Sequence, residues 1–243
     1  MGVGVGCTYW SGSGRAASAQ LYVALTNRCN ARTLPETRGP GFSMGSFSPL
    51  SPHDWEPSED EVVSAVSSAL GLPTPRAPLE PDSLAPICFA GLGEPLLRAA
   101  VLVGATARLR ERAPALAVRV STNGLFAEPR PIVSSLAAAG VSSVSVALAA
   151  ADSVSHTALM APNELCDHRL LAQPGAAHAA VCDFVRRAAE AGLHVECTAV
   201  AAPGVDVDAA RSLALELGAK SWRVREYFPA AGRAPADGPQ RVR

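Results

Sequence analysis

The feature that most constrains the fold of this chain is a regular alternation of strand-like and helix-like segments. Six segments have the apolar or alternating composition of strands: 21–25, 87–90, 117–121, 144–148, 194–200 and 222–227. Helix signals fill the intervals, at 58–70, 95–113, 131–139, 178–191 and 206–218, and most of these segments end at a glycine. The alternation predicts right-handed βαβ units around a parallel sheet, arranged either as a partial barrel or as a doubly wound sheet.

One α/β domain over residues 20–229 accounts for all six predicted strands. The preceding segment, 1–19, is rich in Gly, Ser and Ala and is expected to be flexible. The tail 230–243 is rich in Pro, Gly and Arg and is expected to be disordered. Residues 161–177 follow the fourth strand without a clear helical period, and we expect them to form an inserted loop.

Charge and hydropathy exclude some partners. A net charge of −1 provides no electrostatic footprint for nucleic acid, and no apolar run is long enough to span a membrane. The start of the chain lacks the basic region of a signal peptide, so we expect a cytoplasmic protein and leave organelle targeting open. None of the six cysteines forms a C-x-x-C pair, and no disulfide framework is expected. Cys88 and Cys197 lie inside predicted strands and are expected to be buried thiols.

Polar and reactive side chains gather where the predicted strands end. The carboxyl ends of parallel strands meet at one edge of the sheet, which is where sites form in α/β folds. Cys29 follows the first strand. The candidate ligand-binding residues after the other strands are Gly91, Gly93, Glu94, Pro95, Thr122, Asn123, Asp152 and Arg225. This pattern predicts a small-molecule site at the strand ends, and it identifies no catalytic residue.

Two of these features allow a functional and a structural interpretation. Glu94, after two glycines and before Pro95, is placed either to clamp the ammonium group of a ligand or to cap the next helix. Arg38 lies in a loop with two prolines and two glycines, which suggests a fixed conformation. Its guanidinium group is suited to a phosphate or carboxylate ligand, and the alternative is a solvated surface arginine.

Taken in order, these motifs resemble the radical S-adenosylmethionine (SAM) superfamily. The resemblance covers about residues 20–229 and rests on Cys29, on Gly-Leu-Gly-Glu-Pro at 91–95 and on Ser-Thr-Asn-Gly at 121–124. It looks closest to the branch associated with TatD-type nucleases. The resemblance implies an α/β fold, a six-stranded partial TIM-like barrel in which three cysteines spaced C-x3-C-x2-C bind a 4Fe–4S cluster. It also implies that the Gly-Glu-Pro motif holds the ammonium group of SAM, whose reductive cleavage starts radical chemistry.

The chain departs from this pattern at the cluster loop. Cys29 matches the first cysteine, and Thr33 and Glu36 stand where the second and third belong. A single thiolate does not match the donor set of a 4Fe–4S cluster, and a carboxylate oxygen is a poor ligand for a soft site. The resemblance implies polar residues at the end of strand four that touch the SAM ribose, and the matching stretch here is Ala147-Leu148-Ala149-Ala150-Ala151, followed by Asp152.

Three functions are consistent with these observations. The first is a cluster-deficient radical SAM relative that keeps a pocket for SAM or another small molecule. The second is an active radical SAM enzyme whose cluster is completed by other ligands, such as Cys88 or Cys166. The third is a cluster-free barrel enzyme that uses Glu94, Arg38 and Arg225 on an anionic substrate. No protein partner is indicated.

Overall fold

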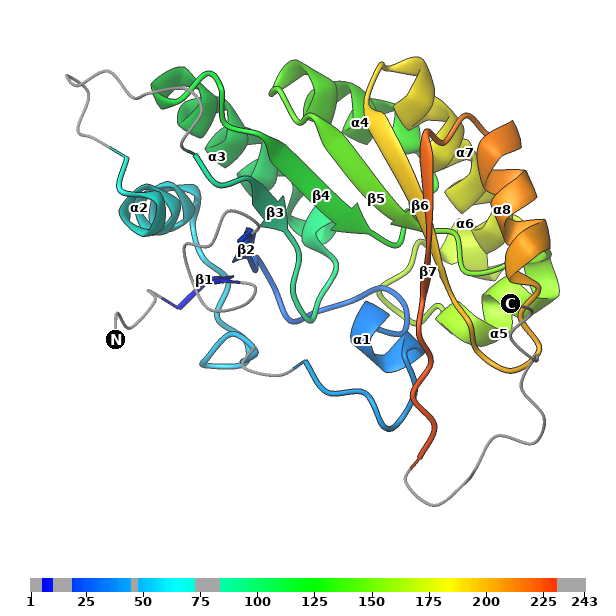
Figure 1. Cartoon of the computed structure of the whole chain (residues 1–243). Coiled ribbons are helices and arrows are strands. Elements are labelled where there is room, and N and C mark those ends of the chain that lie inside the picture. The colour runs from blue at the N-terminus through cyan, green and yellow to red at the C-terminus, as the bar shows by residue number, and fades with distance from the viewer. Residues whose placement is uncertain (1–5, 11–18, 45–47, 73–83, 231–243) are drawn as a thin grey trace, which may run out of the picture.

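The structure is a computed structural model that describes residues 6–10, 19–44, 48–72 and 84–230. Its centre is one sheet in which the seven described strands lie side by side in chain order (Figure 1). The strands are β1 (Thr8–Trp10), β2 (Leu21–Val23), β3 (Ile87–Phe89), β4 (Val118–Thr122), β5 (Ser143–Ala147), β6 (His194–Val200) and β7 (Ser221–Arg225). Strand β1 pairs antiparallel with β2, and every later pair is parallel.

The helices connect neighbouring parallel strands. They are α1 (Leu34–Thr37), α2 (Glu59–Leu70), α3 (Ala99–Arg112), α4 (Pro129–Ala138), α5 (Ser153–Met160), α6 (His168–Leu171), α7 (Ala176–Glu190) and α8 (Val207–Glu216), with a 3-10 turn, η2 (Pro95–Arg98), before α3. Each parallel connection advances to the next strand in the same direction, so right-handed crossovers place the long helices on one face of the sheet. Figure 1 shows α3, α4, α7 and α8 along that outer face, with α1 near the carboxyl ends of the strands.

The two faces of the sheet differ in polarity because successive strand residues point to opposite sides. The outer face carries buried apolar residues that pack under the helices, among them Val23, Phe89 and Val120. The intervening residues carry polar side chains on the inner face, as Arg119 and Glu196 do, and these two form an ion pair across the sheet. The helices therefore enclose the hydrophobic core, and the opposite face is available for a polar site.

The alternating pattern predicted most of this architecture. The six parallel strands and the five long connecting helices are confirmed, with boundaries that differ by a few residues. The strand order agrees with the sequential winding of a partial barrel and not with a doubly wound sheet, whose order reverses at a switch point. The mixed α/β class is therefore confirmed, with a seven-stranded and mostly parallel sheet.

Residues 8–10 lie within the segment that was expected to be flexible. They form β1, in which Tyr9 pairs with Tyr22 of β2, and the two rings stack with centroids 5.1 Å apart. The buried Cys7 carbonyl also accepts a hydrogen bond from Ala24 N at 2.8 Å. The non-local pairing with β2 stabilises a strand that is too short to be recognised from local sequence alone. The predicted disorder at 231–243 lies outside the described residues.

Short helices replace two segments that were expected to be loops. Helix α1 lies in the loop after β2, and α6 lies within 161–177, where Asp167 caps it by accepting a hydrogen bond from Arg169 N at 2.9 Å. Helix α5 was not predicted either, although Asp152 is a good N-cap residue. Within the described residues, no helix is long and apolar enough to cross a membrane.

A buried histidine gives the domain a measurable pH dependence. His156 of α5 is fully buried, neither of its ring nitrogens has a hydrogen-bond partner, and its ring lies 5.2 Å from that of His178. Burial lowers the pKa of His156 from 6.5 to about 4, with a further lowering from His178. The folded state therefore binds fewer protons than the unfolded chain between these pH values, and stability falls as pH drops from 6.5 towards 4.

The variant His156→Leu is expected to remove this dependence. We compare the free energies of unfolding of the variant and the natural chain. Below pH 6.5 the difference in favour of the variant should grow by about 1.4 kcal/mol for each pH unit. Urea titrations of both proteins between pH 7 and pH 4.5 measure the difference. A difference that stays constant with pH would contradict the assignment.

Candidate functional site

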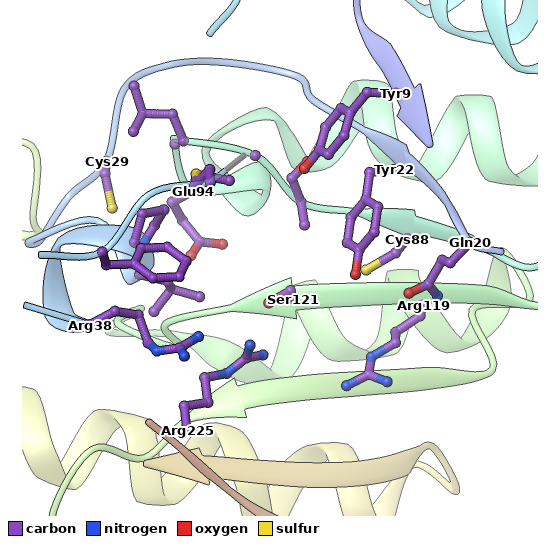
Figure 2. A pocket seen from close by; sticks show the side chains of 18 of the residues that line it. Tyr9, Gln20, Tyr22, Cys29, Arg38, Cys88, Glu94, Arg119, Ser121 and Arg225 are labelled. Atoms are coloured by element: carbon purple, nitrogen blue, oxygen red, sulfur yellow. The ribbon is translucent and has the colours of Figure 1, made fainter. Parts of the chain in front are cut away.

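A cavity of about 510 Å³ lies on the inner face of the sheet, near the carboxyl ends of β2, β3 and β4. Figure 2 shows side chains from several elements pointing into it, with Cys29 and Arg38 at one end and Tyr22, Cys88 and Arg119 at the other. We call it the central cavity. Its lining includes the predicted residues Cys29, Arg38, Gly91, Gly93, Glu94 and Arg225. The structure thus brings together residues that the sequence placed at several separate strand ends.

The loop that carries Cys29 is held on both sides by amide side chains. Asn27 Nδ2 donates to the carbonyl oxygens of Leu50 and His53, each at 2.9 Å. Asn30 Nδ2 donates to Leu125 O at 2.9 Å, and its Oδ1 accepts a hydrogen bond from Asn123 Nδ2 at 2.7 Å. These contacts fix the backbone on either side of Cys29. The thiol therefore has a defined position at the edge of the central cavity.

Glu94 is buried, and three protein donors occupy its carboxylate. Oε1 accepts hydrogen bonds from Leu96 N at 3.0 Å and from Thr122 Oγ1 at 2.7 Å, and Oε2 accepts one from Asn123 N at 2.8 Å. Burial raises the pKa of Glu94 to about 7, against the lowering effect of these hydrogen bonds. The carboxylate therefore caps η2 and ties the loop after β3 to the end of β4. Its proposed contact with a ligand ammonium stays a prediction.

Gly93 and Pro95 have structural reasons for their places in the motif. A Cβ atom at Gly93 would lie 2.3 Å from Arg28 O and 2.5 Å from Thr26 O, so only glycine lets this loop approach the loop after β2. Pro95 occupies the first position of η2, where its missing N–H costs no hydrogen bond. Gly91 contributes to the lining of the central cavity.

The three remaining predicted residues lie outside the cavity lining. Thr122 and Asn123 are buried and donate to the Glu94 carboxylate, and Asn123 Nδ2 also donates to Asn30 Oδ1 and to Cys29 Sγ, the latter at 3.7 Å. Asp152 is exposed, and its Oδ1 accepts hydrogen bonds from Val154 N and Ser155 N at the start of α5. These two hydrogen bonds account for Asp152 as a helix cap.

The residues at the cluster-loop positions do not match the donor set of a 4Fe–4S cluster. Thr33 and Glu36 bind each other: Glu36 Oε2 accepts hydrogen bonds from Thr33 N at 2.8 Å and from Thr33 Oγ1 at 2.6 Å, which forms a capping box at the start of α1. Burial raises the pKa of the Cys29 thiol to about 12. Among the described residues, no group of three His, Cys, Asp or Glu side chains is arranged to hold a metal ion.

The rest of that loop packs against the end of β7. The guanidinium group of Arg38 lies 4.6 Å from the ring centre of Phe42 and 5.3 Å from that of Phe228. Its Nε donates to Glu226 O at 2.6 Å, and Phe228 N donates to Arg38 O at 2.7 Å. Gly39 has a φ of +96°, and a Cβ atom there would lie 2.4 Å from Phe228 O. The fixed conformation suggested by the sequence is present in the structure.

Charged residues inside the strands extend the site beyond the predicted set. Glu196 of β6 pairs with Arg119 of β4 and Arg223 of β7, and it accepts a hydrogen bond from Ser145 Oγ at 2.9 Å. Arg119 and Arg223 line the central cavity, as does the predicted Arg225. The signal for Arg119 was present in the sequence Val118-Arg119-Val120, where a charge between two apolar residues indicates a side chain on the polar face.

Comparisons with solved structures identify the fold. SuiB from Streptococcus suis, in a structure described as bound to S-adenosylmethionine, matches 88% of this chain with a TM-score of 0.59 and 13% identity, over 41% of its own length. Methylornithine synthase (PylB) matches 88% of this chain with a TM-score of 0.54 and 11% identity, over 54% of its length. HydG, a maturase of FeFe-hydrogenase, matches 88% with a TM-score of 0.52 and 11% identity, over 43% of its length.

The chain therefore shares the fold of these three proteins. It spans about two fifths to one half of the length of these proteins. No family model matches the chain, and no curated protein matches it in sequence. The likeness therefore concerns the fold, and the function has to be argued from the site.

Proposed function

We propose that this chain is a cluster-deficient relative of radical SAM enzymes that binds a small molecule in the central cavity. The observation that carries the proposal is the mutual binding of Thr33 and Glu36. These two side chains satisfy each other and the start of α1, so the loop is stable without a metal cluster. The cavity beside it has the size of a small-molecule pocket.

The contacts that hold the residues around the central cavity favour a pocket that still binds a ligand over one that has lost its function. Amide side chains hold the Cys29 loop, Glu94 ties two strand ends together, and Arg38 is stacked against aromatic rings. A pocket held in one conformation needs little ordering when a ligand enters, which favours affinity. SAM is the first ligand to test, because SuiB, which has a similar fold, has a solved structure with SAM bound. The closer resemblance to the TatD-associated branch stays a prediction.

A second function is favoured by one specific observation. Cys29 and Cys88 both line the central cavity, so two thiols face one space. An iron–sulfur cluster completed by further ligands would make the chain an active radical SAM enzyme. Cys29 and Cys88 lie at opposite ends of this cavity (Figure 2), and among the described residues no group of three His, Cys, Asp or Glu side chains is arranged to hold a metal ion. We therefore rank this function second.

Anaerobic reconstitution of the full chain with iron and sulfide separates the two functions. We expect the protein to remain colourless and to retain no stoichiometric iron after desalting, because one loop thiol cannot replace three. Iron and sulfide analysis and an absorption spectrum measure the result. A brown protein with a band near about 400 nm would establish the second function and overturn the first. Calorimetric titration of the same protein with SAM tests the ligand.

A further inference from the structure

The central cavity carries positive charge that the described residues do not neutralise. Four arginines line it: Arg38, Arg119, Arg223 and Arg225. The acidic lining residue, Glu94, directs its carboxylate to three protein donors. Arg119 and Arg223 share the single carboxylate of Glu196. Within the described part of the chain, no ion pair is formed by Arg38 or Arg225.

Arg38 and Arg225 approach the same part of the cavity from different elements. Figure 2 shows their guanidinium groups pointing toward one another, Arg38 from the loop after α1 and Arg225 from the end of β7. Burial and the charges of Arg223 and Arg38 lower the pKa of Arg225. Burial, with the charge of Arg223, likewise lowers the pKa of Arg38 against the effect of Glu226. Partly buried groups of like charge that lie close together destabilise the protein unless an anion binds between them.

The arrangement of Arg38 prepares it to bind such an anion. The rings of Phe42 and Phe228 hold its guanidinium plane, and the backbone oxygen of Glu226 takes its Nε–H. The terminal nitrogens are then held in one orientation, which suits the forked recognition of a phosphate or carboxylate. The hydroxyl groups of Tyr22 and Ser121 also face the cavity and add hydrogen-bonding capacity (Figure 2).

We infer that the central cavity binds a small molecule through an anionic group, a phosphate or a carboxylate, held between Arg38 and Arg225. This inference rests on the proposed function, since it names the ligand class of the same pocket. Apolar lining residues, Leu34, Leu92 and Met44, provide contacts for an uncharged body attached to the anion. SAM carries a carboxylate, but its sulfonium and ammonium groups give it a net positive charge, so it matches this end of the cavity less well than a ligand with a net negative charge.

The test is calorimetric titration of the full chain at low ionic strength. The probes are pyrophosphate as the phosphate arm, glutarate as the carboxylate arm, and adenosine and SAM as ligands without a net negative charge. We expect one of the two anions to bind, and Arg225→Gln and Arg38→Gln each to weaken that binding about tenfold to a hundredfold. The matched control is Arg211→Gln, an exposed residue of α8, which should bind like the natural chain.

The outcomes separate the inference from the function on which it rests. Binding of adenosine, or binding of SAM that Arg38→Gln and Arg225→Gln leave unchanged, without binding of either anion would overturn the inference and leave the proposed function standing. No binding of any probe would count against both. Anion binding that all three variants retain would show attraction to the general surface and overturn the inference. Thermal melting should show Arg225→Gln to be as stable as the natural chain, and Arg225→Lys, which keeps the charge, should bind better than Arg225→Gln.

Discussion

Replacing Glu94 with alanine is expected to destabilise the domain by at least about 3 kcal/mol, because three buried donors would lose their acceptor at about 1 kcal/mol or more each. The donors are Leu96 N, Thr122 Oγ1 and Asn123 N. For a domain of this size the loss corresponds to a fall in melting temperature of about 10 °C. Urea unfolding and thermal melting followed by circular dichroism measure both quantities.

Two variants sharpen this test. Glu94→Gln keeps the oxygen that accepts from Leu96 and Thr122, and it should lose clearly less stability than Glu94→Ala. Glu216→Ala removes an exposed carboxylate on α8 and should be close to neutral. An alanine variant at position 94 as stable as the natural chain would show that the carboxylate is dispensable for the fold. It would return Glu94 to its alternative role as a ligand contact.

The strands predicted from the sequence are those whose own residues, and whose neighbouring strands, have a clear apolar pattern. Ile87–Phe89 and His194–Val200 contain apolar runs that must be buried, so their place in a parallel sheet follows from the chain alone. Thr8–Trp10 consists of residue types that favour strands, but it is three residues long, and its place in the sheet comes from pairing with β2, where Tyr9 stacks on Tyr22. Such a contact joins segments that local patterns do not connect. Short helices were missed for a related reason, since a single capping residue such as Asp152 is common outside helices.

Some features of the candidate site were also predictable from the sequence, and others were not. The position of Cys29, Glu94 and Arg225 at strand ends predicted their gathering, since parallel strands share one carboxyl edge. The occupation of the Glu94 carboxylate was not predictable, because it depends on where the end of β4 lies relative to the loop after β3. The pair of Glu196 with Arg119 was missed because it requires the order of the strands. Spacing can place a side chain at an edge, but its partners come from the neighbouring strands.

Restoring the two missing cysteines should give the chain a metal cluster. In Thr33→Cys/Glu36→Cys, two thiols join Cys29 on one loop, with the spacing of the radical SAM motif. Positions 33 and 36 are the two members of the α1 capping box, at the N-cap and at the third helical position, so their side chains already approach each other. After anaerobic reconstitution we expect this variant to become brown and to retain iron and sulfide, whereas the natural chain stays colourless.

The control for this experiment removes the capping box without adding thiols. Thr33→Ala/Glu36→Ala loses the same hydrogen bonds and should remain colourless, so colour in the cysteine variant can be assigned to the new ligands. The melting temperatures of the two variants show whether the loop still folds, because each lacks one capping box worth about 1 kcal/mol. A folded cysteine variant that takes up no iron would mean that the Arg38–Phe228 contacts hold the loop in a shape unsuited to a cluster. Three thiols with this spacing would then not be sufficient for a cluster in this loop.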